Sequence, residues 1–322
     1  MKVLVAGGAG YVGSVLVPRL LERNCEVDVV DLLWFGNHLP GGVKVIQKSI
    51  MSLSDADVKG YDQVIFIAGL SNDPMAEYSP AHNFIDNAAS PAYLAYISKR
   101  AGVKRIIYGC SCSVYGYSID TLCDEASPAV SNYPYGISKL QGEFACLRLQ
   151  DDHFSAISLR KGTVSGYSPR MRLDLVVNTM FKSAVTDKVI TVNNPSIWRP
   201  VLDIRDAASA YIRAVEADYH ISGIFNIASA NYTVGEIADH VREGVRDHLD
   251  INARLDIKYM QDYRNYKVAL EKARNVLSFN PRYNVRDIIK SLIDNWDQFK
   301  DMDNPNYYNI RVFKSLNMAV VS

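Results

Sequence analysis

The sequence predicts an α/β fold: a Rossmann-type doubly wound parallel sheet with a smaller, discontinuous C-terminal lobe. The first apolar run, residues 2–6, ends in a glycine-rich turn that opens a segment with helical spacing. Short apolar runs then alternate with helical segments up to about residue 160, which is typical of a parallel sheet covered on both faces. After Arg160 this alternation loosens, and a second lobe is expected there.

The elements follow in order along the chain. We expect helices over 11–23 and 80–100 and from about Pro134 onward, because apolar residues recur there at helical spacing. Right-handed crossovers place the carboxyl ends of parallel strands on one edge of the sheet, where ligands bind. Six strands are expected in this half, at residues 2–6, 26–31, 43–46, 63–68, 105–108 and 154–159.

Beyond Arg160 we expect helices over 173–185, 234–249 and 285–299 and a strand over 189–192, while the strand 224–227 returns to the sheet. The segment 301–322 is ambiguous between a tail and a docked helix. We therefore predict a Rossmann domain over 1–165, with about 195–228 returning to it. Residues 166–194 and 229–322 form the second lobe.

Composition limits the classes of function. Lys plus Arg and Asp plus Glu balance at 35 each, which argues against bulk attraction to nucleic acid or anionic lipid. No apolar run reaches the ~18 residues of a membrane span, and the first strand follows Met1 without a cleavage site. The five scattered cysteines suggest reduced thiols in the cytosol, and no spacing suits a metal site. We expect a cytoplasmic protein with neither membrane nor nucleic-acid partner and no metal.

The glycine turn is the strongest local motif. Glycines permit a tight turn and let the backbone approach a pyrophosphate, while the helix that follows presents free amides and the positive end of its dipole. Between a strand and a helix, the motif predicts dinucleotide binding. The contacts are expected from Gly7, Gly10, Tyr11, Val12 and Gly13.

Asp31 closes the second strand. A carboxylate there accepts hydrogen bonds from the adenosine ribose and repels a 2′-phosphate. No Arg follows, since Leu32, Leu33 and Trp34 come next. The cofactor is therefore predicted to be NAD rather than NADP.

Tyr135 and Lys139 stand four residues apart, on one face of the helix that begins near Pro134. A nearby ammonium lowers the pKa of a phenol, so this pair can act as a base near neutral pH. Ser111 would stand at the end of the fifth strand, where its hydroxyl can bridge a substrate hydroxyl to Tyr135. Ser113 lies on the same side of the strand and is the rival candidate.

Taken together, these motifs resemble the extended short-chain dehydrogenases/reductases, the NAD-dependent nucleotide-sugar epimerase/dehydratase family. They span most of the chain in the right order. The matching residues are the Gly7/Gly10/Gly13 turn, Asp31, Ala68, Gly69, Asn87, Ser111, the Val114-Tyr115-Gly116 run, Tyr135, Lys139, Leu159, Arg160, Arg199, Pro200, Asp203 and Asp206.

The resemblance implies a role for each candidate. Tyr135 would be the base and also contact the cofactor, Lys139 would hold the nicotinamide ribose and Ser111 would polarise the sugar hydroxyl. Further cofactor contacts would come from Ser49, Ile50, Ala68, Gly69, Leu70 and Asn87. The substrate, a nucleotide-diphosphate sugar, would be held by Ser71, Asn72, Ser113, Arg170, Arg172, Asn178, Arg199 and Arg264, since arginines clamp a pyrophosphate well.

The sequence departs from the family pattern at three places. The family's 4,6-dehydratases follow the catalytic Ser or Thr with Asp-Glu, and its decarboxylases carry Glu at the second of these positions. Here Cys112 and Ser113 stand there. Thr163 also replaces a common Asn, and Lys48-Ser49-Ile50 stands where an adenine-contacting Asp is usual.

The resemblance therefore favours a redox-neutral epimerase that oxidises a sugar hydroxyl transiently to a keto-sugar. A net oxidoreductase, either a sugar 4-dehydrogenase or a 4-keto-sugar reductase, is the alternative that uses the same residues. A decarboxylase, a dehydratase and a dinucleotide-sensing regulator without chemistry are less favoured. Family members commonly dimerise through the helices 80–100 and 134–151, so a homodimer is expected.

Overall fold

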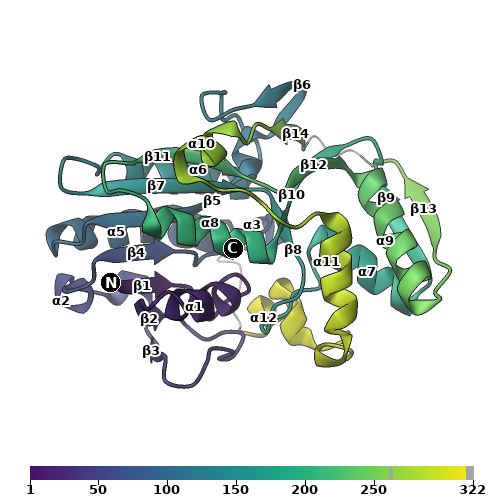
Figure 1. Ribbon diagram of the computed structural model, residues 1–322, viewed down its shortest axis with the longest axis horizontal. Coiled ribbons are helices and arrows are strands. Elements are labelled where there is room, and N and C mark those ends of the chain that lie inside the picture. The colour runs from purple at the N-terminus through teal and green to yellow at the C-terminus, as the bar shows by residue number, and fades with distance from the viewer. Residues whose placement is uncertain (261–263, 317–322) are drawn as a thin grey trace.

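The computed structural model describes residues 1–260 and 264–316, and its centre is a seven-stranded sheet in the order β11-β7-β5-β4-β1-β2-β3 (Figure 1). Every neighbouring pair is parallel. The predicted doubly wound parallel sheet is confirmed. Its strands are β1 (Lys2–Ala6), β2 (Glu26–Val30), β3 (Lys44–Ile46), β4 (Gln63–Phe66), β5 (Arg105–Ser111), β7 (Ser155–Lys161) and β11 (Gly223–Ile227).

Unbroken apolar runs form these strands because both faces of the sheet are covered. In β1, Val3 and Val5 pack under α1 (Gly13–Leu21), α8 (Ile204–Glu216) and α10 (Glu271–Leu277). Leu4 and Ala6 point to the opposite face, which α2 (Asp55–Val58), α5 (Ser90–Arg100) and α6 (Pro134–Leu147) cover. The helices α3 (Asp73–Tyr78), α8 and α10 and the short α2 were not among the predicted elements.

The helix predicted over 80–100 has three parts. It begins as α4 (Pro80–Phe84), continues through a π-helical turn, η2 (Ile85–Ala89), and ends as α5. A separate short helix, α3 (Asp73–Tyr78), precedes it and is capped by the Asn72 side chain. The π-helical turn changes which side chains of this segment face the edge of the sheet.

The second lobe has its own apolar core among α7 (Val176–Thr186), α9 (Val234–Leu249) and α11 (Val285–Asp294). Two smaller sheets flank it: β9 (Val189–Asn193) with β13 (Arg254–Lys258), and β10 (Trp198–Asp203) between β8 (Thr163–Ser165) and β12 (Ala230–Thr233). A third pair, β6 (Tyr117–Cys123) with β14 (Asn265–Val268), joins distant segments beside the main sheet.

The C-terminal segment forms a short docked helix, α12 (Asn309–Ser315), and residues 317–322 lie outside the described part. Within the described residues, four single-turn 3₁₀ segments complete the fold: η1 (Ile50–Ser52), η3 (Cys112–Tyr115), η4 (Trp296–Gln298) and η5 (Pro305–Tyr307). Our division of the chain into domains stays a proposal, and α10 packs with the sheet rather than with the second lobe's core.

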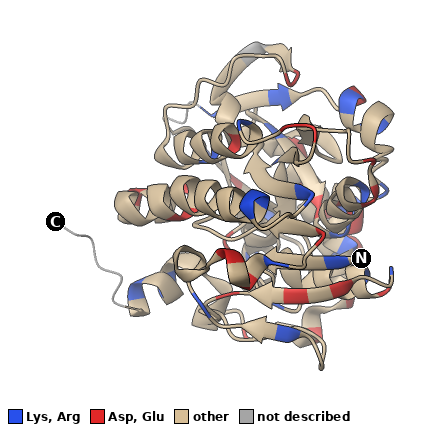
Figure 2. Cartoon of the chain, turned by 90° about the vertical axis from the view of Figure 1, so that its left-hand side faces the viewer, with Lys and Arg blue, Asp and Glu red and all other residues tan. Residues whose placement is uncertain are grey.

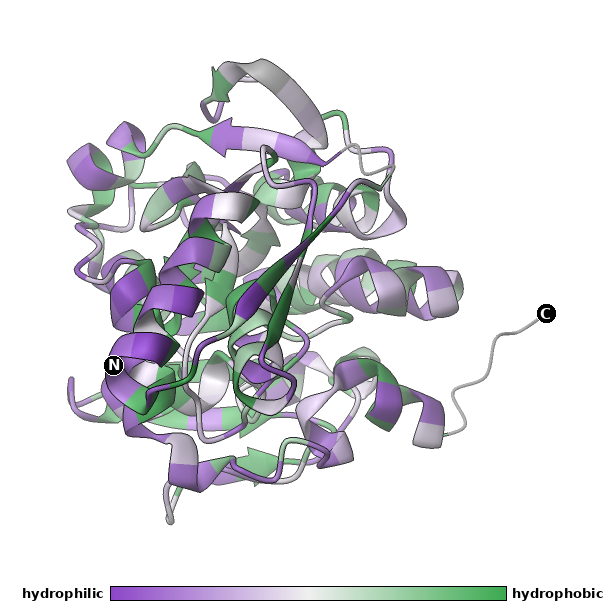
Figure 3. Ribbon diagram, turned by 90° about the vertical axis from the view of Figure 1, so that its right-hand side faces the viewer, coloured by the Kyte–Doolittle hydropathy of each residue, from purple (hydrophilic) through white to green (hydrophobic). Residues whose placement is uncertain are grey.

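Charges of both signs are interspersed over the face seen in Figure 2. The helices of the second lobe that face the viewer in Figure 3 carry hydrophilic and hydrophobic segments side by side, as amphipathic helices do. None of the helices in the described part of the chain has the length and apolarity needed to cross a bilayer.

Candidate active site

The glycine turn joins β1 to α1 at the carboxyl edge of the sheet. Gly7 has φ +83°, and a Cβ there would lie 2.5 Å from the Ala68 backbone nitrogen, so only glycine fits. Gly13 is equally constrained, because a Cβ would overlap the Gly8 carbonyl. The turn therefore lies close to the end of β4, and the amino end of α1 opens beside it.

Asp31 stabilises the glycine turn through a hydrogen bond and also lines the cavity beside it. One carboxylate oxygen accepts the Ala9 backbone N–H at 3.0 Å and the other accepts that of Leu33 at 2.8 Å. Burial raises the pKa of Asp31, and these hydrogen bonds oppose the rise. Each oxygen keeps a further lone pair for a ligand hydroxyl.

Two predicted cofactor contacts, Leu70 and Asn87, do not line the cavity. Leu70 is buried against Met75 and Phe313. The π-helical turn directs Asn87 inward, where its amide donates to the Leu70 carbonyl at 2.8 Å, while the neighbouring Asp86 lines the cavity. Gly69, at φ +115°, faces Asn87 so closely that a Cβ would overlap its Oδ1. Asn87 thus holds the loop after β4 in place.

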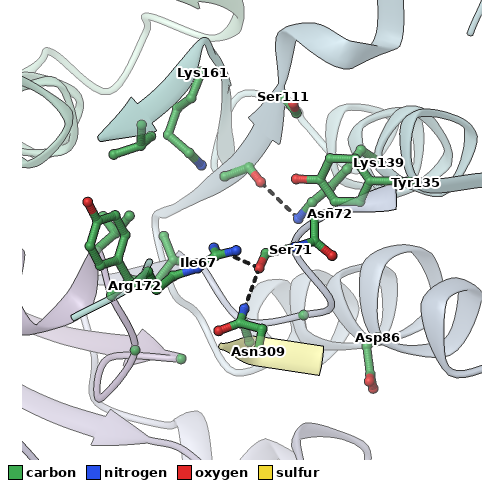
Figure 4. Close-up of a pocket in the computed structure, with 18 of the residues that line it drawn as sticks. Ile67, Ser71, Asn72, Asp86, Ser111, Tyr135, Lys139, Lys161, Arg172 and Asn309 are labelled. Atoms are coloured by element: carbon green, nitrogen blue, oxygen red, sulfur yellow. Dashed lines mark hydrogen bonds between the residues drawn. The ribbon is translucent and has the colours of Figure 1, made fainter. Parts of the chain in front are cut away.

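Ser111, Tyr135 and Lys139 come together at one end of the same cavity (Figure 4). Ser111 ends β5, and its hydroxyl accepts from the Ser113 hydroxyl at 2.9 Å. Burial raises the pKa of the Tyr135 phenol, and a side-chain hydrogen bond with Ser111 pulls it down. The two hydroxyls are therefore within reach of a common substrate oxygen.

Lys139 lies one helical turn after Tyr135 on α6. Its ammonium donates to the Gly109 carbonyl at 3.1 Å and sits 5.2 Å from the centre of the Tyr108 ring. Burial lowers the pKa of Lys139 to about 8. This cation sits at the Tyr135 end of the cavity, where it favours the phenolate form of a nearby tyrosine.

The predicted substrate contacts occupy two separate regions. Arg172 pairs with Asp174 at 2.8 Å and donates to Ser71 at 2.9 Å, and Arg170 lies beside it. Arg264 pairs with Asp73 at 2.6 Å, and Arg199 donates to the Arg264 carbonyl. All four arginines line the cavity, as do Ser71, Asn72 and Ser113.

Asn178 is the exception among the predicted substrate contacts, because it is fully buried and does not line the cavity. Its side chain accepts the Gly166 N–H at 3.0 Å and donates to the Arg172 carbonyl at 2.8 Å. It fixes the segment that carries Arg170 and Arg172.

Comparison with known proteins identifies the family. The model of the NAD dependent epimerase/dehydratase family matches residues 3–228. The chain belongs to this family. Its members are NAD-dependent enzymes, so NAD is the cofactor of this enzyme, as predicted.

Relatives with different activities match to a similar extent. UDP-glucuronic acid decarboxylase 6 of Arabidopsis thaliana is 27% identical, with 89% of this chain and 86% of that protein covered. UDP-glucose 4-epimerase of Corynebacterium glutamicum is 26% identical, with 90% and 94% covered. These relatives therefore show the family of this chain but not which reaction it catalyses.

Solved structures match in fold. MoeE5 in complex with UDP-glucuronic acid and NAD has a TM-score of 0.82 at 23% identity, with 93% of this chain and all of that chain covered. UDP-glucose 4-epimerase of Thermotoga maritima, with UDP-glucose, has a TM-score of 0.82 at 21% identity, with 92% and 99% covered.

The cavity suits the family's cofactor. It runs without interruption from the glycine turn and Asp31 to Ser111 and Tyr135, and Ser49 and Ile50 line it beyond Asp31. Within it, the buried Arg170 guanidinium has two nitrogens without a hydrogen-bond partner, which suits an anionic ligand. Among residues 1–260 and 264–316, no three His, Cys, Asp or Glu side chains cluster as metal ligands do.

Lys161, Asp86 and Asn309 are among the cavity residues that were not predicted from the sequence. Lys161 ends β7, and its ammonium donates to the Tyr211 hydroxyl at 2.7 Å. Asp86 faces the cavity, and burial raises its pKa to about 6. Asn309 belongs to α12, in the segment whose structure was ambiguous. For Lys161 the sequence signal was a second charge, directly after Arg160, at the end of an apolar strand.

Proposed function

We propose that the enzyme is an NAD-dependent epimerase of a nucleotide-diphosphate sugar, acting through transient oxidation to a keto-sugar. The observation that supports this most is that Ser111, Tyr135 and Lys139 line the same cavity as the glycine turn (Figure 4). NAD supplies a hydride acceptor that later returns the hydride. Tyr135 takes the proton of the sugar hydroxyl and gives it back, and Ser111 orients that hydroxyl.

The residues after Ser111 support an epimerase over a dehydratase. Cys112 is fully buried, donates its thiol hydrogen to the Arg160 carbonyl and has a pKa raised by burial. Ser113 donates its hydroxyl hydrogen to Ser111. Neither position offers the carboxyl group that elimination or decarboxylation uses in relatives with Asp-Glu or Glu there.

Net oxidation of a nucleotide sugar, or reduction of a keto-sugar, is the second candidate. The specific observation that favours it is the number of titratable groups in the cavity, with Lys161 and Asp86 added to Tyr135 and Lys139. A net reaction must exchange a proton with solvent in every cycle, whereas an epimerase returns the same proton.

Cofactor retention separates the two candidates. The protein is purified without added dinucleotide and denatured, and the released cofactor is identified by mass and by absorbance near 340 nm. Retained, mostly oxidised NAD is expected, together with conversion of a UDP-sugar to an isomer of equal mass. Stoichiometric NADH or an accumulating keto-sugar would favour the net oxidoreductase, and a Tyr135→Phe enzyme with normal turnover would contradict both.

We also propose a homodimer formed through the helices 80–100 and α6. Three large apolar side chains on these helices, Ile85, Tyr96 and Phe144, are 46%, 48% and 58% exposed in the isolated chain. Light scattering of the purified protein tests this. A cytoplasmic location is proposed from the five cysteines, which are all free and buried.

A further inference from the structure

Arg170 is a buried cation whose hydrogen-bonding capacity is largely unused. Its side chain is 2% exposed, and it donates through Nη2 to Asn309 Oδ1 at 2.5 Å. Nε and Nη1 have no partner among the described residues. The guanidinium carbon lies 3.6 Å from the centre of the Phe35 ring. A buried charge left in this state costs free energy, so the site is built for an anion.

The surroundings of Arg170 belong to the dinucleotide turn. Phe35 lies in the loop that follows Asp31, and the Asp31 and Arg170 charges are close enough to influence each other's pKa. The Ser168 hydroxyl donates to the Tyr11 carbonyl at 2.8 Å, and the Tyr11 hydroxyl donates to the Gly166 carbonyl at 2.6 Å. The segment before Arg170 is thus hydrogen-bonded to the phosphate-binding turn.

The other arginines lie elsewhere or are already paired. Arg199 and Arg264 contact each other, and Arg264 lies against Asp73 and the Tyr133 ring, near the start of α6. Arg172 has Asp174 as its ion-pair partner. Burial lowers the pKa of Arg170 to about 9, and repulsion from Arg172 adds to this. A phosphate that binds near the glycine turn would therefore provide the missing hydrogen-bond acceptors for Arg170.

We propose that Arg170 binds the pyrophosphate of the NAD cofactor, rather than that of the sugar nucleotide, and that Asn309 of α12 positions it. This assigns part of the second lobe and the C-terminal helix to the cofactor site. It rests on the family's use of NAD and not on which sugar reaction follows.

α12 is well anchored for this role. The Asn309 amide donates to the Ser71 hydroxyl at 2.8 Å, and its backbone N–H donates to Asp174 at 3.2 Å (Figure 4). Phe313 is fully buried, with Trp34 and Tyr78 ring centres 5.7 and 6.0 Å away. The helix thereby joins the loop after β2 to the loop and helix after β4.

The test compares two ligands on the full chain freed of bound dinucleotide. NADH and ADP-ribose probe the cofactor site, and UDP probes the site of the sugar nucleotide. Arg170→Gln should weaken NADH and ADP-ribose by about ten-fold or more, the scale of a lost charge-assisted hydrogen bond, and should change UDP less than two-fold. Arg264→Gln is the reciprocal control and should weaken UDP more than NADH.

Asn309→Ala tests the positioning role with Arg170 intact. It should weaken NADH by a smaller factor, about three-fold, and should raise its dissociation rate in stopped flow. The melting temperature gives a second readout. Without ligand, Arg170→Met should melt at the same or a higher temperature than wild type, because an unpaired charge is gone, but NADH should raise that temperature less.

Three outcomes would overturn the proposal. In the first, Arg170→Gln weakens UDP and leaves NADH unchanged, which would return Arg170 to the substrate site. In the second, adenosine loses as much affinity as ADP-ribose, which would make Arg170 a partner of the base. In the third, Asn309→Ala leaves both the affinity and the dissociation rate of NADH unchanged.

Discussion

The Lys161 ammonium lies 2.7 Å from the Tyr211 hydroxyl, and both side chains crowd the face of Gly109 in β5. Burial lowers the pKa of Lys161 to about 7, and the charge of Lys139 adds to the effect, while Cys110 and Cys112 oppose it weakly. In the folded chain, Lys161 is therefore about half-protonated near pH 7. When it is protonated, its buried charge lowers the stability of the fold.

Replacing Lys161 should therefore stabilise the protein below neutral pH. Between pH 7 and the ordinary lysine pKa of 10.5, the unfolded chain binds one more proton than the folded chain, so wild type gains stability as pH rises. Lys161→Met should gain about 1 kcal/mol near pH 6, or roughly 2–4 °C in Tm, and the gain should shrink above pH 7. The exposed Lys59→Met is the matched control. A gain that grows with pH would contradict this.

The Tyr135–Lys139 pair predicts a pH signature. Lys139 has a pKa of about 8, so its cation is present below that pH, and a nearby cation favours deprotonation of a phenol such as Tyr135. Lys139→Met should lower kcat/KM by about 10²–10⁴-fold and move the rise of activity to higher pH. Tyr135→Phe should lose activity at every pH while it keeps NADH affinity. An unchanged pH profile in Lys139→Met would separate the lysine from the base.

The buried Glu143–Arg160 pair predicts a large effect on stability. Arg160 donates to both Glu143 oxygens, with 2.6 Å to Oε1, and both side chains are almost fully buried. The pair joins α6 to β7. Arg160→Met alone should cost about 3–5 kcal/mol in chemical denaturation because Glu143 is left unpaired. The double variant Glu143→Leu/Arg160→Met should recover part of that loss. If it recovers none, packing rather than charge explains the effect.

Two glycines separate backbone strain from close packing. Gly60 and Gly69 both have positive φ, at +88° and +115°, but a Cβ at Gly60 meets nothing within 4 Å, whereas at Gly69 it overlaps Asn87. Gly60→Ala should cost about 1–2 kcal/mol from strain alone. Gly69→Ala should cost more and should also weaken NADH binding, since it shifts the loop beside the glycine turn. Equal NADH affinities in the two variants would contradict the role given to that loop.

Much of the fold could be predicted because buried parallel strands appear in the sequence as short apolar runs. All six strands expected in the first half appear in the sheet, and α9 matches its predicted bounds. The pairing of β6 with β14 could not be predicted in this way, since the two strands are far apart in the sequence. The π-helical turn was also not predicted, because the sequence on both sides of it has ordinary helical spacing.

The candidate site divides in the same way. Ser111, Tyr135 and Lys139 carry local motifs, and the structure brings their side chains to one cavity, although their roles remain predictions. Lys161 and Asn309 carry none, because their position depends on Tyr211 and on Ser71, far away in the chain. Asn178 was assigned to the substrate from its motif, yet its side chain bonds to the Gly166 and Arg172 backbone and to the Tyr11 hydroxyl.

The Tyr11 hydroxyl donates to the Gly166 carbonyl and accepts from the Asn178 amide, and these hydrogen bonds bear on how the dinucleotide enters and leaves. They join the glycine turn to the second lobe, so the two cannot part there without exposing buried polar groups. We infer that the cofactor leaves more easily beneath α12, where Phe313 and Asn309 make the contacts of that helix. The rate of cofactor exchange would then be set by the detachment of α12 and not by the rate of catalysis. One molecule of NAD would serve many successive turnovers.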